Sequence, residues 1–280
     1  MRPTLSETCS PTLWLWAGRA LFLGPSLDLD RHSGAVACLA VGLERPFTAR
    51  LDAAPAVTAR SALIPARVPH RLCSGGGQMI FCYLDPGSPA ERTCRSLMCD
   101  GSAPPVRHRH ENTLLTLGAA LAEAATAEAD GAETTGAEAA GADAAGAEAA
   151  REWLSAAAPE PVAPAPGDPG VRLAADAVLG DPARNWRAGE LAALTGWSVS
   201  AFLRAFRAET GTSFRRYRLW ARMLRVGQVL AGGGNLTLAA AEAGFATPSH
   251  LSSTFHGMFG LTPSRLLETG VAIRDLSRGL

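Results

Sequence analysis

The last third of the chain contains one pattern twice, and this repeat restricts the accessible folds more than any other feature. The copies are "LAALTGWSVSAFLRAFRAETGTS" (191–213) and "LAAAEAGFATPSHLSSTFHGMFGLTP" (238–263). Each begins with a short Leu/Ala segment that ends at a glycine, and an aromatic residue and a Ser or Thr follow. Large apolar residues then stand four positions apart, as helix packing requires. Each copy therefore predicts a helix, a tight glycine turn and a second helix with a Ser or Thr cap, which is a helix-turn-helix unit.

A helix-turn-helix unit uses the apolar face of its second helix for packing and leaves the opposite face free to enter a major groove. The aromatic pair Phe202/Phe206 in the first copy and the pair Leu251/Phe255 in the second would do this packing. Between the copies, residues 214–231 predict one long helix rich in arginine. The pattern therefore predicts two reading helices joined by a linker helix, about one DNA turn apart on the same face.

Two stretches resemble a known family. "ETGTSFRRYRLWARM" resembles the stretch that enters the linker helix of the AraC/XylS family of bacterial transcription regulators, and "GFATPSHLSSTFHGMFGLTPSRL" resembles its C-terminal signature. The resemblance covers roughly residues 171–268. It implies an all-α DNA-binding domain at 171–280, with units at 187–209 and 237–259, in a sequence-specific transcription regulator. The implied partners are double-stranded DNA, a small-molecule effector and, for an activator, RNA polymerase.

The same resemblance implies which side chains meet DNA. Arg204 suits guanine O6 and N7, and Leu203 suits a thymine methyl group. The implied base-reading residues are Ser200, Leu203, Arg204 and Arg207 in the first unit and Ser249, His250 and Ser253 in the second. The implied contacts with the DNA backbone are Arg215, Arg216, Arg218, Arg222, Arg225 and His256. A solvated helix face without a partner is the alternative for these arginines.

The second copy departs from the family, which usually has Arg or Lys where this chain has Ser253, His256 and Gly257. The first copy is therefore expected to read DNA more sharply. Charge supports a polyanion partner for this half of the chain: residues 171–280 hold 13 Arg against 7 acidic residues, whereas residues 1–170 hold 13 Arg against 19.

The N-terminal part, residues 1–110, alternates short apolar runs with Gly, Pro and Asp, which favours a β-barrel or sandwich. It resembles the cupin-like effector domain of one branch of the same family, so the expected class is α+β in two domains, a cupin-like barrel and a double helix-turn-helix. His32 and His70 stand near the positions of cupin metal ligands and mark a weak candidate effector pocket. A third ligand is lacking, so no metal or other cofactor is expected.

Two alternatives stay open. One is a cupin-type enzyme with a helical assembly module, although no set of catalytic residues emerges and a non-enzyme is expected. The other is a metal or redox sensor, although the spacing of its residues matches no familiar zinc pattern. Its residues would be Cys73, Cys82, Cys94, Cys99, His108 and His110.

Between the two domains, a leucine cluster (Leu114, Leu115, Leu117 and Leu121) suggests a dimerisation helix at 111–130 and thus a homodimer. The repeat "GAETTGAEAAGADAAGAEAA", which could form at most a frayed helix, and the proline-rich "PEPVAPAPGDPG" predict a low-complexity linker over 131–170. No secretory signal or long apolar stretch is visible, so a cytoplasmic protein without a membrane partner is expected.

Overall fold

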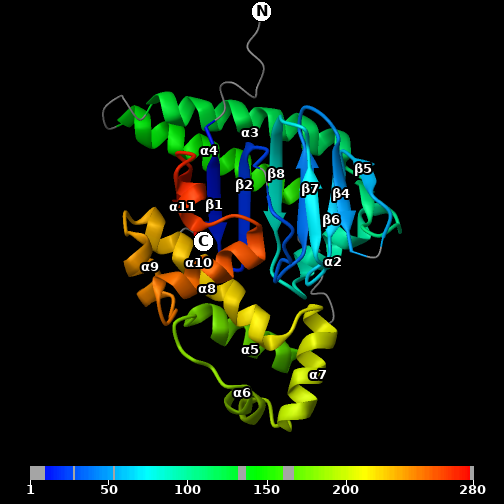
Figure 1. Ribbon diagram of the computed structural model, residues 1–280, viewed down its shortest axis with the longest axis vertical. Coiled ribbons are helices and arrows are strands. Elements are labelled where there is room, and N and C mark those ends of the chain that lie inside the picture. Colours follow the sequence, from blue (N-terminus) through cyan, green and yellow to red (C-terminus); the bar gives the residue numbers. More distant parts are fainter. Residues whose placement is uncertain (1–9, 28, 53, 132–136, 160–166, 278–280) are drawn as a thin grey trace, which may run out of the picture.

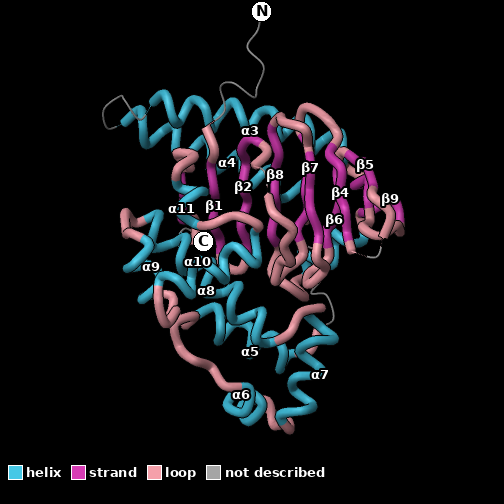
Figure 2. The backbone as a smooth tube through the Cα atoms, in the orientation of Figure 1, coloured by secondary structure: helices cyan, strands magenta, loops and turns pink. Residues whose placement is uncertain are grey.

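A computed structural model describes residues 10–27, 29–52, 54–131, 137–159 and 167–277. Strands dominate the N-terminal part and helices the C-terminal part, as Figures 1 and 2 show. The expected α+β composition is therefore confirmed at this level.

Two sheets make up the N-terminal part. The larger has eight strands in the order β11-β1-β2-β8-β3-β6-β10-β9, and the smaller has the order β5-β4-β7. The strands of the first half of the chain are β1 (Thr12–Trp16), β2 (Arg19–Pro25), β3 (Cys38–Gly42), β4 (Phe47–Leu51), β5 (Val57–Ala59), β6 (Ser61–Ile64), β7 (His70–Cys73), β8 (Gln78–Tyr83), β9 (Met98–Asp100) and β10 (Val106–His108). A short helix, α2 (Pro89–Ser96), leads from the central strands to β9.

The sheets do not form the closed barrel that the sequence suggested. The larger sheet ends at β11 on one side and at β9 on the other, and the residues described show no pairing between those two strands. Alternating side chains fill the space between the two sheets, with Phe47, Ala40 and Phe81 in one buried cluster. The architecture is therefore an open, sheet-rich domain.

A helical hairpin, α3 (Glu111–Gly131) and α4 (Ala137–Ala157), runs beside the sheets at the top of Figure 1. Trp153 of α4 is fully buried, and its indole N–H donates to the Leu114 carbonyl at 3.0 Å. Residues 137–157 therefore differ from the predicted linker, because one tryptophan with several alanines lets this helix pack on α3. Residues 132–136 and 160–166 of the predicted linker lie outside the described residues. Leu114 and Leu121 are buried in the same cluster, so the leucines that suggested a dimer face contact the chain itself.

Seven helices follow in residues 167–277. They are α5 (Pro169–Gly180), α6 (Ala188–Leu194), α7 (Val199–Thr210), α8 (Phe214–Ala231), α9 (Leu236–Glu242), α10 (Pro248–Phe259) and α11 (Pro263–Leu267). Ser, Thr, Asn or Asp side chains cap most of their N-termini, as the sequence indicated.

The chain then returns to the first domain, which the sequence did not predict. Strand β11 (Ala272–Asp275) pairs in parallel with β1, so that Thr12 lies opposite Ala272. The Gln228 amide of α8 donates to the Ser277 hydroxyl at 3.1 Å, just beyond this strand. The segment that follows the second helix-turn-helix unit therefore forms an edge of the N-terminal sheet.

The place of α4 in the core predicts a stability effect. Trp153→Ala should lower the free energy of unfolding by about 3–5 kcal/mol, because it removes a fully buried indole and leaves a cavity. Chemical denaturation of the full chain measures this change. Glu148→Ala, at an exposed position of the same helix, is the control; equal effects of the two substitutions would contradict a core role for α4.

Candidate nucleic-acid interface

The first helix-turn-helix unit consists of α6 and α7. Gly196 in the turn has φ 71°, a conformation that glycine adopts without strain, and the Ser198 hydroxyl accepts from the Ala201 N–H to begin α7. Phe202 and Phe206 are fully buried, and each ring centroid lies 5.5 Å from that of Phe214. This aromatic cluster fixes α7 on the start of α8.

The opposite face of α7 points away from that cluster. Ser200, Arg204 and Arg207 are exposed, and Leu203 keeps 41% of its surface accessible. These four base-reading candidates lie at helical spacing on one side, so the structure brings them together on an open face.

The second unit, α9 and α10, has the same glycine turn and N-terminal cap, but the aromatic residues of its second helix are less buried. Gly244 has φ 75°, and the Thr247 hydroxyl caps α10. Leu251 and Met258 are buried, whereas Phe255 and Phe259 are only partly buried and lie 4.6 Å apart by ring centroid. Ser249, His250 and Ser253 are exposed on the outer face.

The C-terminal end of α10 is held by the N-terminal domain. The Asp30 and Ser33 N–H groups donate to the carbonyls of Gly260 and Gly257, at 2.9 and 3.1 Å. His256 lies 3.1 Å from the Asp30 carboxylate. His256, predicted to contact the DNA backbone, is therefore engaged within the chain.

The linker-helix arginines separate into two groups. Arg215 is exposed and makes no ion pair or hydrogen bond within the part of the chain that the structure describes. The other four have intramolecular partners: Arg216 donates to Ser33 and Gly34, Arg218 to Asn185, Arg222 to Pro182 and Arg225 to Glu242. Burial lowers the pKa of Arg216, Arg218 and Arg222 from the ordinary arginine value. In this conformation these four side chains act as structural links.

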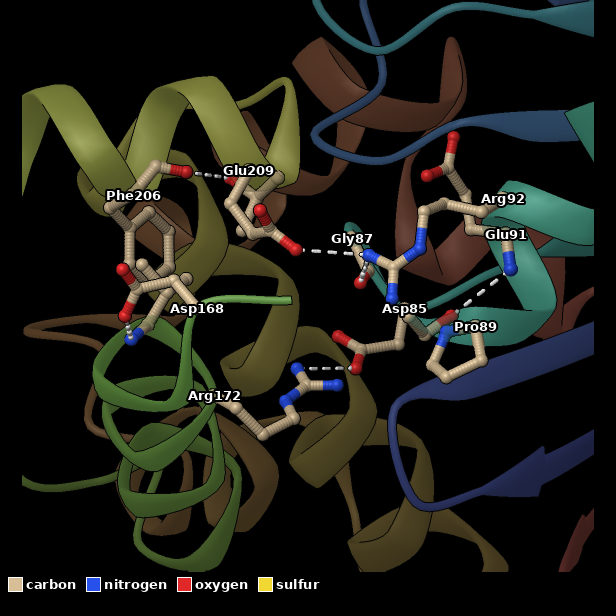
Figure 3. Close-up of polar contacts among 12 residues, drawn as sticks. Asp85, Gly87, Pro89, Glu91, Arg92, Asp168, Arg172, Phe206 and Glu209 are labelled. Atoms are coloured by element: carbon tan, nitrogen blue, oxygen red, sulfur yellow. Dashed lines mark hydrogen bonds and ion pairs between the residues drawn. The ribbon is translucent and has the colours of Figure 1, made fainter. Parts of the chain in front are cut away.

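A buried carboxylate, which the sequence did not reveal, joins the N-terminal domain to α5 and α8, two helices that share a core with the first unit. Asp85 accepts from the Tyr217 hydroxyl at 2.7 Å and from Arg172 at 2.9 Å. Nearby, Arg92 pairs with Glu209 at the end of α7, at 3.0 Å. Figure 3 shows Asp85 facing Arg172 and Arg92 facing Glu209 across the domain boundary. Burial raises the pKa of Asp85, and the neighbouring Arg172 and Tyr217 oppose that rise.

His32 and His70 lie together in the N-terminal domain, with ring centroids 4.3 Å apart. Their Nδ1 atoms lie 2.8 and 2.9 Å from the carbonyls of Asp30 and Val68. Burial lowers the pKa of both, that of His70 to about 4. Within the described ranges no three His, Cys, Asp or Glu side chains gather as a metal site. The pair also lies outside the apolar cavity described next.

That cavity lies between β1, β2 and β8 on one side and α8, α10 and α11 on the other. It has a volume of about 100 Å³, and none of its lining side chains is charged. Tyr83, Trp220 and Phe259 form part of the wall, with the Tyr83 ring centroid 5.9 Å from Trp220 and 5.6 Å from Phe259. This cavity, away from His32 and His70, is the stronger candidate for an effector site.

The cysteines give little support to a sensor. Cys38, Cys82 and Cys94 are buried, and burial raises the pKa of each thiol. Buried thiols with raised pKa values react poorly with oxidants and metals. Cys73 and Cys99 are exposed.

The Asp85 contacts predict a measurable coupling between the domains. Asp85→Ala should lower the free energy of unfolding by about 1–3 kcal/mol, because it leaves the buried Tyr217 hydroxyl without its acceptor. Thermal or urea unfolding tests this. Asp176→Asn is the matched control, since that carboxylate is exposed and lies 3.7 Å from the same Arg172; a loss as large as that of Asp85→Ala would contradict the assignment.

Comparison with known proteins agrees with this geometry. Residues 191–269 match the family described as "Helix-turn-helix domain". Over 93 residues the chain is 33% identical to the transcriptional regulator SirC of Salmonella typhimurium (strain SL1344), a match that covers 33% of this chain and 31% of SirC. The chain thus spans about a third of the length of that relative.

Solved structures of ToxT from Vibrio cholerae share the whole architecture. An apo ToxT variant from strain SCE256 superposes with a TM-score of 0.53 at 12% identity, covering 90% of this chain and 97% of that chain. Wild-type ToxT of the same strain, bound to an unsaturated fatty acid, gives a TM-score of 0.51 at 12% identity, covering 97% and 99%. At this identity the likeness concerns the fold.

SirC is a transcriptional regulator by its name, and the alternative of a cupin-type enzyme receives no support from these matches. Helices in the described part of the chain are too short or too polar to cross a membrane. The match over residues 191–269 includes the turn and the second helix of both units, so this part of the chain is similar to the helix-turn-helix domains of that family.

Proposed function

We propose that this chain is a sequence-specific transcription regulator that binds duplex DNA through both helix-turn-helix units. The outward face of α7 carries the proposal. Arg204 and Arg207 are exposed there, and their guanidinium groups form no ion pair or hydrogen bond with any residue of the described ranges. Free guanidinium groups on the second helix of such a unit are suited to guanine edges and phosphates.

We assign the remaining DNA contacts to side chains that are exposed on the same helices. Ser200 and Leu203 accompany the two arginines in the major groove, and Ser249, His250 and Ser253 form the weaker reading face of α10. Arg215 is the linker-helix side chain available to a phosphate. The other linker arginines and His256 would reach DNA only after giving up their present partners.

The effector belongs in the apolar cavity. ToxT structures contain an unsaturated fatty acid or (E)-4-(8-methylnaphthalen-1-yl)but-3-enoic acid. Here the lining is apolar and joins the N-terminal sheet to α8 and α10, so a small apolar molecule would change how the two domains contact each other. Contacts with RNA polymerase and homodimerisation stay predictions.

DNA binding should depend strongly on salt. For a duplex selected from a randomised pool, the affinity of the full chain should fall by more than about tenfold between about 50 and about 200 mM salt, because phosphate contacts release counterions. Fluorescence anisotropy measures this. Failure to select any duplex, or binding that does not change with salt, would overturn the proposed function.

Arg204→Ala tests direct reading by α7. The variant should lose about 1–3 kcal/mol of binding free energy and relax its preference at one base pair of the selected site. Arg151→Ala, on the exposed side of α4, serves as the control and should bind as the wild type does. A uniform loss across all sequences would make Arg204 a phosphate contact.

A further inference from the structure

Arg222 lies where two hydrophobic cores meet along α8. Phe214, Tyr217 and Ala221 enter the core of the first unit. On the other side, Trp220, Met223, Leu224, Val226 and Val229 enter the core shared with the second unit. Arg222 is only 9% exposed, so its guanidinium is turned into the protein rather than toward solvent.

The side chain of Arg222 touches both units. Its Nε–H donates to the Pro182 carbonyl at 3.3 Å, in the loop 181–187 that leads into α6. Its guanidinium carbon lies 5.7 Å from the ring centroid of Phe245, the aromatic residue in the turn of the second unit. One planar cation therefore bridges the entrance of the first unit and the turn of the second.

The same loop meets the second unit directly. A Cβ added at Gly244 would lie 2.6 Å from the Ala183 carbonyl oxygen, so only glycine allows this approach. Arg218, one turn before Arg222 on α8, donates to Asn185 of the loop. Within the loop, the Trp186 indole N–H donates to the Asp181 carbonyl at 3.0 Å, and the Arg184 guanidinium stacks 3.8 Å above the Trp186 ring. The loop is thus a well-supported contact surface.

We infer that Arg222, together with the contact of Gly244 with Ala183, sets the distance and angle between the two reading helices and so determines which half-site spacing the protein accepts. This role rests on the proposed function. Inserting one base pair moves a half-site by about 3.4 Å and turns it by about 35° around the duplex. Two units locked side by side cannot follow that movement, whereas units connected through α8 alone can tilt toward it.

A bridging role of Arg222 predicts a different result from a contact of Arg222 with the DNA backbone. A phosphate contact would add affinity equally at every spacing and would leave the preference for one spacing unchanged. A bridge between the units alters the preference itself.

The test is a spacing series with the full chain. The site selected by the wild type is rebuilt with one or two base pairs added or removed between its halves, and the dissociation constant is measured for each duplex. Wild type should favour the selected spacing by at least about tenfold over its neighbours. Arg222→Met, which keeps the apolar stem and removes the charge and the donor, should reduce that ratio to about threefold or less.

Arg225→Met is the matched control, because it removes the same charge one turn later on α8, from an arginine paired with Glu242 at 2.5 Å. It should retain the wild-type spacing ratio. Arg222→Lys covers the case in which Arg222→Met does not fold, as judged by circular dichroism; it keeps the charge, loses the planar group and should also flatten the series.

The spacing series distinguishes failure of the inference from failure of the proposed function. A folded Arg222 variant with the wild-type spacing ratio and uniformly weaker binding would overturn the inference, as would a wild type that accepts all spacings equally. Failure of the wild type to bind any selected duplex would instead overturn the proposed function, and the inference with it.

Discussion

The packing of α8 is the constraint on which the rest of the structure depends. Its apolar side chains enter the cores of both helix-turn-helix units, and Gly227 brings it against β1, where a Cβ would lie 2.6 Å from a Leu15 methyl group. Because interiors are densely packed, a helix shared by several cores cannot shift in one without disturbing the others. The N-terminal sheet, the apolar cavity and the two reading helices are therefore mechanically connected through one element.

The N-terminal domain contacts the two units through different kinds of interaction. Near the first unit, the contacts are polar and partly or fully buried, through Asp85 with Arg172 and Tyr217, and through Arg92 with Glu209. Near the second unit, the two domains enclose an apolar cavity, and Phe255 and Phe259 form part of its wall. The loop at Asp30 contacts the end of α10 beside it. A ligand in that cavity would act on the second unit first, while the reading face of α7 stays open to solvent.

The two helix-turn-helix units follow from short-range patterns in the sequence. Glycine turns, Ser and Thr caps and apolar residues four apart predict units at 187–209 and 237–259, and the observed helix pairs α6–α7 and α9–α10 begin and end within one residue of those bounds. Short-range patterns do not predict contacts between segments that are distant in the sequence. The Ala/Gly repeat predicts a linker because its pattern has no apolar stripe, yet Trp153 anchors α4 on α3. The family resemblance implies DNA contacts for five arginines of α8, yet four of the five have partners within the chain.

By itself, the sequence determined the two helix-turn-helix units, the helix that joins them and the family to which they point. These features follow from local backbone preferences and from side-chain periodicity, which are properties of neighbouring residues. Only the tertiary structure decided that β11 joins the N-terminal sheet, that Asp85 connects the domains and that Arg222 is a bridge. Each of these depends on which surfaces, far apart in sequence, lose water together, and that cannot be computed from any one segment.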